Sequence, residues 1–217
     1  MKKRSSKHLP YFAVLEALRQ PGCLLCTLVA GETRRYLRHL LDEFVNDPGF
    51  RKEWHNSRGF CHRHSWMLAD APDALGLSIL YLDLVDVYGE GILEHPTGVM
   101  CPVCAAEDRQ IKTHLGILVE HWNDPELREA LSKSEGLCGP HLRAAMNTVA
   151  PGKARDELRR VSLKSVALLK SQLTQLAESF DYRRQPPHDE AVSRAWLRAI
   201  QKIVGVREMR DDAWPSP

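Results

Sequence analysis

The stretch Cys23-Leu24-Leu25-Cys26 opens a pattern that the chain uses twice. A Cys-x-x-His half-motif follows it, and the same two half-motifs return in the second half of the sequence. All six cysteines of the chain belong to this pattern. Three thiols and one imidazole are the ligands of a closed tetrahedral zinc site, so the sequence predicts one Cys3His site per copy. The predicted ligands are Cys23, Cys26, Cys61 and His64 in the first copy, and Cys101, Cys104, Cys138 and His141 in the second.

The two copies indicate an internal duplication. The gap between half-motifs spans residues 27–60 in the first copy and 105–137 in the second, so the first is one residue longer. Asn46-Asp47-Pro48 returns as Asn123-Asp124-Pro125, and the missing residue falls just after Phe44, at the end of a helical pattern. The comparison also selects the histidine ligand, because His62 has no histidine counterpart in the second copy.

The spacing suits a metal held between helix ends. Cys-x-x-Cys lets one turn of chain supply two ligands, and a helix N-terminus stabilises thiolates through its free N–H groups and positive dipole. Gly59 and Gly136, which precede the Cys-x-x-His half-motifs, can turn the chain toward the metal. Within each copy, the metal would join the start of a long helix to the start of a short one about 35 residues later.

Other chemistries remain open alternatives. Three cysteines and a histidine can also hold an iron–sulfur cluster, and each Cys-x-x-Cys could carry thiol redox chemistry. Disulfides are a third alternative. Four protein ligands leave no open position for water, which favours a structural zinc site over hydrolysis. The sequence contains no Gly-rich phosphate loop, nucleophile elbow or His-Glu-x-x-His segment, so an enzyme is the less favoured interpretation.

Apolar residues recur with helical spacing through most of the chain, and no alternating strand pattern occurs. The predicted fold is therefore an all-α helical bundle built from two pseudo-symmetric repeats. We expect the first metal-binding repeat at residues 8–95 and the second at 96–182. Residues 183–217 are expected to form a linker, an amphipathic helix capped by Asp189 and ended by Gly205, and a disordered tail.

Composition is ordinary for a globular protein, with 43% hydrophobic and 27% charged residues and a net charge of +2. Residues 151–217 carry 13 basic and nine acidic side chains, which is the only hint of nucleic-acid binding. The apolar stretch from Leu9 to Leu15 is too short for a signal peptide, and no segment approaches membrane-spanning length. A reducing cytoplasm is therefore expected, where such cysteines bind metal rather than pair.

Four stretches of the sequence are distinctive: the opening His8-Leu9-Pro10-Tyr11-Phe12, the first Cys-x-x-Cys, Gly59-Phe60-Cys61-His62-Arg63-His64 and Cys101-Pro102-Val103-Cys104. With them the chain resembles an uncharacterised family of bacterial proteins with a duplicated cysteine-pair motif. The resemblance covers residues 8–180, and it implies a bacterial origin but no activity.

The favoured interpretation is a cytoplasmic zinc protein with two ions in structural Cys3His sites, acting as an interaction, scaffold or regulatory module. A protein partner is expected, nucleic acid is a weaker alternative, and no membrane partner is expected. The competing interpretation is a redox or iron–sulfur protein or enzyme that uses the same centres.

Overall fold

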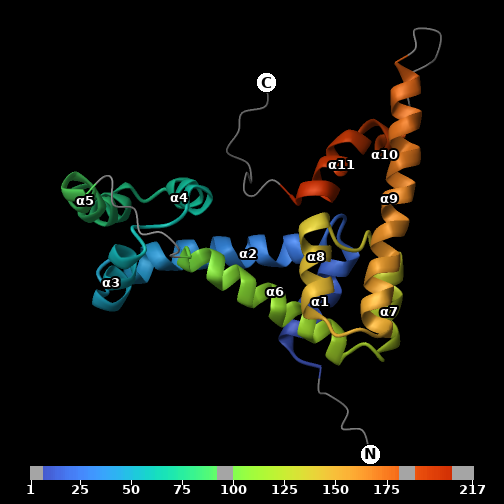
Figure 1. Cartoon of the computed structure of the whole chain (residues 1–217), viewed down its shortest axis with the longest axis horizontal. Coiled ribbons are helices and arrows are strands. Elements are labelled where there is room, and N and C mark those ends of the chain that lie inside the picture. The colour runs from blue at the N-terminus through green and yellow to red at the C-terminus, as the bar shows by residue number, and fades with distance from the viewer. Residues whose placement is uncertain (1–6, 92–99, 181–188, 207–217) are drawn as a thin grey trace, which may run out of the picture. The chain divides into compact units, whose positions relative to one another are not determined.

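The computed structural model describes residues 7–91, 100–180 and 189–206, and within them it contains helices and no strand (Figure 1). The predicted all-α fold is confirmed. The helices are α1 (Leu9–Arg19), α2 (Leu24–His39), the π-helix η1 (Leu40–Phe44), α3 (Pro48–Asn56), α4 (His62–Ala69), α5 (Ala74–Gly91), α6 (Pro102–Glu120), α7 (Pro125–Lys133), α8 (Gly139–Thr148), α9 (Lys153–Ser179), α10 (Glu190–Ser193) and α11 (Ala195–Val204).

The repeated Asn-Asp-Pro triplets start helices. The Asp47 carboxylate accepts a hydrogen bond from the Phe50 N–H at 2.7 Å, and Pro48 is the first residue of α3. Asp124 caps α7 in the same way, accepting from the Glu126 N–H at 2.9 Å. These carboxylates satisfy N–H groups that have no partner within the helix.

The extra residue of the first copy coincides with the π-helix. Residues Leu40–Phe44 continue α2 with the wider π turn, which holds one more residue per hydrogen-bonded ring than an α turn. The insertion that the sequence comparison places after Phe44 is therefore absorbed by the last turn of the long helix. This keeps Leu40 and Leu41 buried.

Helix α1 was not predicted. Its buried residues are Tyr11, Val14, Leu15, Ala17 and Leu18, and their three- and four-residue spacing is the signal that the sequence offered.

The chain divides into two compact units that differ from the predicted repeats. Unit 1 comprises residues 1–29 and 111–217, and unit 2 comprises residues 30–110. Both boundaries fall inside long helices, α2 and α6. Each compact unit thus combines segments of both sequence repeats, and the predicted repeat boundaries at 8–95 and 96–182 remain a proposal about the sequence.

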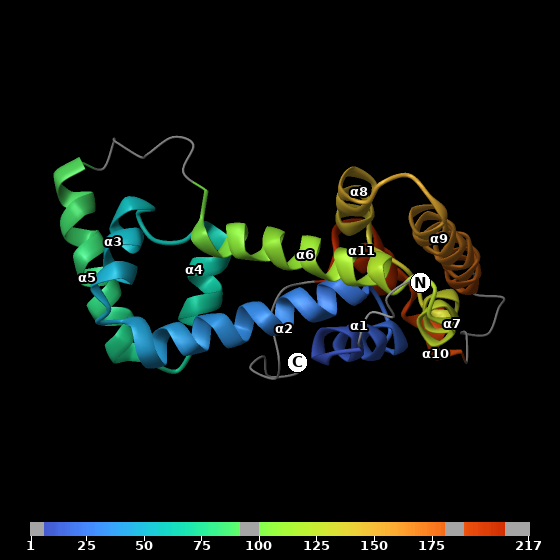
Figure 2. The ribbon, with the colours of Figure 1, turned by 90° about the horizontal axis from the view of Figure 1, so that it is seen from below.

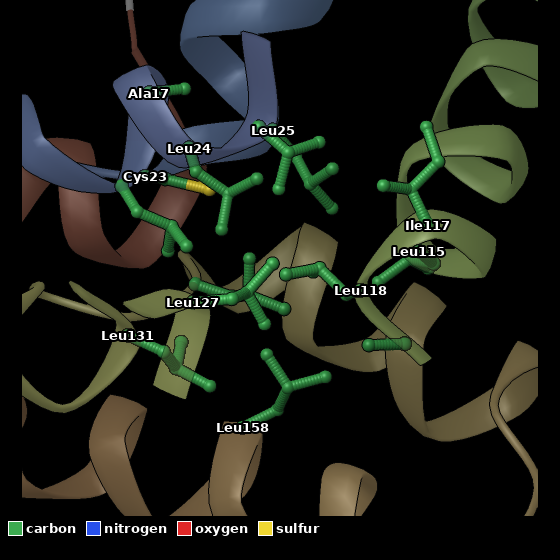
Figure 3. Close-up of a cluster of buried hydrophobic side chains, with 14 of the residues drawn as sticks. Ala17, Cys23, Leu24, Leu25, Leu115, Ile117, Leu118, Leu127, Leu131 and Leu158 are labelled. Carbon is green, nitrogen blue, oxygen red and sulfur yellow. The ribbon is translucent and has the colours of Figure 1, made fainter. Parts of the chain in front are cut away.

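The core of unit 1 is built from aliphatic side chains of α1, α2, α6, α7, α8 and α9. Figure 3 shows Leu24 and Leu25 converging with Leu118 and Leu127, while Leu158 of α9 closes the cluster. The terminal residues of α2 and α6 that lie in unit 1 are thereby fixed by apolar packing.

The core of unit 2 centres on Trp54 of α3, which is fully buried. Its indole N–H donates to the Leu80 carbonyl of α5 at 3.0 Å, and Phe60 packs edge-on against the indole ring. Helices α3 and α5 consequently lie against each other, as Figure 2 shows.

The predicted C-terminal amphipathic helix is present but is divided in two. Asp189 caps α10, a turn at Arg194 separates it from α11, and Gly205 ends α11 with a positive φ of 92°. Both helices pack on α9. The predicted linker at 183–188 and the tail from Arg207 lie outside the described residues. No helix in the described part of the chain has both the length and the apolar character to cross a bilayer.

Candidate metal centres

Two glycines direct the Cys-x-x-His half-motifs. Gly59 and Gly136 have φ values of 81° and 70°, as their predicted turn role requires. A β carbon on Gly136 would lie 2.8 Å from the backbone nitrogen of Ser162, so the turn is seated directly on α9. The Ser162 hydroxyl accepts the Leu137 N–H at 2.8 Å. Cys138 is thereby placed at the start of α8, and Cys61 occupies the same position before α4.

The eight predicted ligands gather into two groups, but the predicted pairing of half-motifs is wrong. The unit 1 group consists of Cys23, Cys26, Cys138 and His141, and the unit 2 group consists of Cys61, His64, Cys101 and Cys104. The Cys-x-x-Cys of each copy therefore meets the Cys-x-x-His of the other copy.

The crossed pairing makes the two groups nested along the chain. The unit 1 group joins segments 112 to 118 residues apart, and the unit 2 group joins segments 37 to 43 residues apart inside that loop. Each group lies within one compact unit. The expectation that a metal joins segments about 35 residues apart within one repeat is therefore replaced by contacts between repeats.

The unit 1 group has the dimensions of a tetrahedral site. Its Sγ atoms lie 3.4, 3.4 and 3.2 Å from the His141 Nδ1 atom, and the Cys26 and Cys138 Sγ atoms are 3.6 Å apart. Bonds of about 2.3 Å to sulfur and about 2.0 Å to nitrogen give edges of roughly 3.8 Å between sulfurs and roughly 3.5 Å from sulfur to nitrogen. The donor atoms are thus spaced to share one ion.

The unit 2 group repeats this geometry. The His64 Nδ1 atom lies 3.3 to 3.5 Å from the three Sγ atoms, and the Cys61 and Cys104 Sγ atoms are 3.7 Å apart. In each group all donor atoms lie within 4.8 Å of one another. All six cysteines are free thiols, so the disulfide alternative does not describe this structure.

Helix N-termini surround both groups, as the sequence predicted. Cys23 and Cys101 immediately precede α2 and α6, while Cys138 and Cys61 precede α8 and α4. Burial raises the Cys101 pKa. The hydrogen bond to the His64 imidazole and the backbone N–H groups of Cys61, Cys104 and Val103 outweigh burial and bring the pKa to about 6. The site therefore favours the thiolate that a metal needs.

Glu107 lies directly behind the His64 ligand of the unit 2 group, and the sequence analysis did not predict it. The His64 Nε2 atom lies 3.1 Å from a Glu107 carboxylate oxygen, which also accepts the Thr33 hydroxyl at 3.0 Å. Arg63 pairs with the other carboxylate oxygen. Burial would lower the His64 pKa, but hydrogen bonds to Cys101 and Glu107 raise it to about 9. A carboxylate behind a ligating histidine fixes the orientation of the ring and raises its basicity.

In the unit 1 group the repeat position of Glu107 carries no carboxylate. Val29 occupies the repeat position of Glu107, and Pro140 occupies that of Arg63. This difference between the copies was the only sequence signal for Glu107. The two groups share a donor set but differ in their surroundings.

We predict that Glu107→Gln weakens metal binding at the unit 2 group by about 10- to 100-fold, because the outer-shell charge is lost while the side-chain shape is kept. Competition with a chelator measures the effect, and the unit 1 group serves as an internal reference. Asp108→Asn, which alters the exposed neighbouring carboxylate, is the matched control. Equal affinities in the two variants would contradict the role of Glu107.

His62, Asp83 and His121 lie outside both groups. The His62 Nε2 atom accepts the Trp66 indole N–H at 3.2 Å, and the Asp83 carboxylate is bound by His55 at 3.0 Å and by Arg51. The His121 ring packs 4.8 Å from the ring of Tyr11.

The fold and the two groups define an all-α protein with paired Cys3His centres capable of holding metal ions. The chain belongs to DUF6062, a family of unknown function whose model matches residues 2–87 and 94–210. The predicted resemblance to an uncharacterised family with a duplicated motif is confirmed. No curated protein and no solved structure shows a significant match to the chain.

Proposed function

We propose that this chain is a zinc-binding helical protein whose two Cys3His sites are structural, and that it serves as an interaction, scaffold or regulatory module. The observation that carries the proposal is the placement of three Sγ atoms and one Nδ1 atom, in each group, at the edge lengths of a single-metal tetrahedron. Zinc favours this donor set and geometry.

The donor spacing favours a single ion over an iron–sulfur cluster. In a [4Fe–4S] cluster each protein ligand binds a different iron, and in a [2Fe–2S] cluster only two protein ligands share an iron. The four protein donors of a cluster are therefore farther apart than four donors that bind one ion. Here all four donors of each group fit within 4.8 Å.

A structural role is favoured over catalysis because the four donors fill a tetrahedron and leave no position for substrate. At the unit 1 group, the adjoining pocket is lined by Cys23, Cys138 and residues of α11, and it has a volume of only about 20 Å³. That space is comparable to one water molecule.

Unit 2 offers a surface suited to a protein partner. Leu75, Leu82 and Val85 of α5 are all more than 60% exposed, and their spacing places them on one helix face. Such an apolar stripe is typical of interaction surfaces.

We propose that the protein works in a bacterial cytoplasm, where thiols stay reduced and favour metal binding. Nucleic-acid binding is a weaker alternative, which rests only on the basic C-terminal third. If the protein binds nucleic acid through phosphate contacts, its affinity should fall steeply as the salt concentration rises.

We expect protein purified without chelators to carry about two zinc ions per chain, because two complete ligand sets are present. Elemental analysis measures the metal, and the visible spectrum separates the alternatives, since zinc protein is colourless and an iron–sulfur protein is brown. Reconstitution with cobalt(II) should give the spectrum of tetrahedral thiolate coordination at both groups. Iron and inorganic sulfide in the purified protein, or fewer than two metal equivalents after reconstitution, would count against the proposal.

A further inference from the structure

The C-terminal helices complete the surroundings of the unit 1 group. Helices α10 and α11 contact α9, and α11 also contacts α8, the helix that carries His141 (Figure 1). Val192 and Ala195 are buried in this packing. The segment 189–206 is therefore docked on the same unit that holds the group.

The end of α11 lies against the sulfur atoms. A β carbon on Gly205 would lie 3.7 Å from the Cys26 Sγ atom and 3.9 Å from the Cys138 Sγ atom. Nearby, the carbonyl oxygen of Ile203 in α11 lies 2.7 Å from the position that a β carbon on Gly139 would take at the start of α8. The 2.7 Å approach leaves no room for a β carbon at Gly139, whereas at Gly205 the positive φ of 92° favours glycine. The α11 terminus and the metal-binding half-motif therefore fit each other directly.

Helix α11 also brings positive charge to the group. Lys202 lines the same small pocket as Cys23 and Cys138, and its ammonium donates to the Glu135 carbonyl at 2.6 Å. Arg198 lines the pocket too and pairs with the Glu135 carboxylate at 3.4 Å. Three thiolates, a neutral imidazole and a divalent ion carry a net charge of about −1, which a neighbouring ammonium offsets.

The unit 2 group has different surroundings. Its three cysteines are partly exposed, whereas Cys23, Cys26 and Cys138 are buried. Its nearby polar shell consists of Glu107, Arg63 and Thr33, all within unit 2. It therefore supplies a reference site for any effect that acts through α11.

We propose that metal binding at the unit 1 group and docking of the segment Asp189–Val206 are coupled, so that this segment acts as a latch that closes over the ion and is released when the ion is lost. The proposal rests on the proposed function, because it requires a metal in the group. The ion would fix the sulfur positions beside Gly205 and set the charge near Lys202. Coupling of this kind is reciprocal, so undocking α11 must weaken metal binding by the same factor.

The first test compares equivalent ligand substitutions in the full chain by hydrogen exchange. Cys138→Ser removes a ligand from the unit 1 group, and Cys61→Ser removes the equivalent ligand from the unit 2 group. We expect amides of α10 and α11 to exchange about 5- to 150-fold faster in zinc-loaded Cys138→Ser than in zinc-loaded Cys61→Ser. Equal protection of α11 in the two variants would overturn the latch.

The second test runs the coupling in the opposite direction. Ala195→Asp places a charge in the buried contact of α11, while Ile200→Asp places the same charge on the exposed face of the same helix. In a Cys61→Ser background, which leaves the unit 1 group as the complete site, zinc transfer to a chelator should be about 5- to 150-fold more favourable in Ala195→Asp than in Ile200→Asp.

The outcomes separate the two proposals. If both α11 variants bind zinc equally well at the unit 1 group, the latch is wrong and the proposed zinc function stands. If the unsubstituted protein binds no zinc at either group, the proposed function fails and the latch fails with it.

Discussion

The double variant Cys23→Ser/Cys138→Ser is expected to retain about one zinc ion per chain, whereas Cys23→Ser/Cys61→Ser is expected to retain none. The first pair removes two ligands from the unit 1 group and leaves the unit 2 group complete. The second pair removes one ligand from each group. Elemental analysis after gel filtration in the presence of a weak chelator measures the retained metal.

The control for this experiment is Cys61→Ser/Cys101→Ser, which removes two ligands from the unit 2 group and should also retain about one ion. Pairing within each repeat makes the opposite prediction, in which Cys23→Ser/Cys61→Ser keeps one ion and both other double variants lose both. Circular dichroism shows whether each variant retains its helices, so that metal loss can be separated from unfolding.

Removal of the metal, by a chelator or by Cys138→Ser, is expected to lower the melting temperature by about 10 °C or more. Structural zinc contributes roughly 10 kcal/mol in small domains that are unfolded without it. A loss of roughly 4 kcal/mol is enough for this shift in a protein of this size. The helices should largely persist because unit 1 has an aliphatic core of its own. Calorimetry measures the shift, and dye binding measures newly exposed apolar surface.

A metal-free protein that melts at the same temperature as the zinc-loaded protein would contradict the structural role. If that protein had also lost a measurable catalytic activity, the two groups would be functional centres. Asp108→Asn, which alters an exposed carboxylate that is not a metal ligand, provides the reference for nonspecific effects of mutation.

Local chemistry in the sequence determined the helices and their starting points. Asp47-Pro48 and Asp124-Pro125 act through hydrogen bonds to residues two or three positions away, so the sequence alone is sufficient to place α3 and α7. Gly59 and Gly136 likewise specify a backbone conformation at one position. The set of eight candidate ligands was predictable because the duplication marks them twice.

Tertiary structure decided which half-motifs meet. The two Cys-x-x-Cys half-motifs are chemically equivalent, and so are the two Cys-x-x-His half-motifs, so the sequence could not distinguish pairing inside a copy from pairing between copies. The packing of the aliphatic core brings the start of α2 to the start of α8, and thereby assigns Cys23 and Cys26 to Cys138 and His141. Glu107 and Gly205 gained their places beside the ligands in the same way, because long-range contacts in three dimensions leave no periodic signal in the sequence.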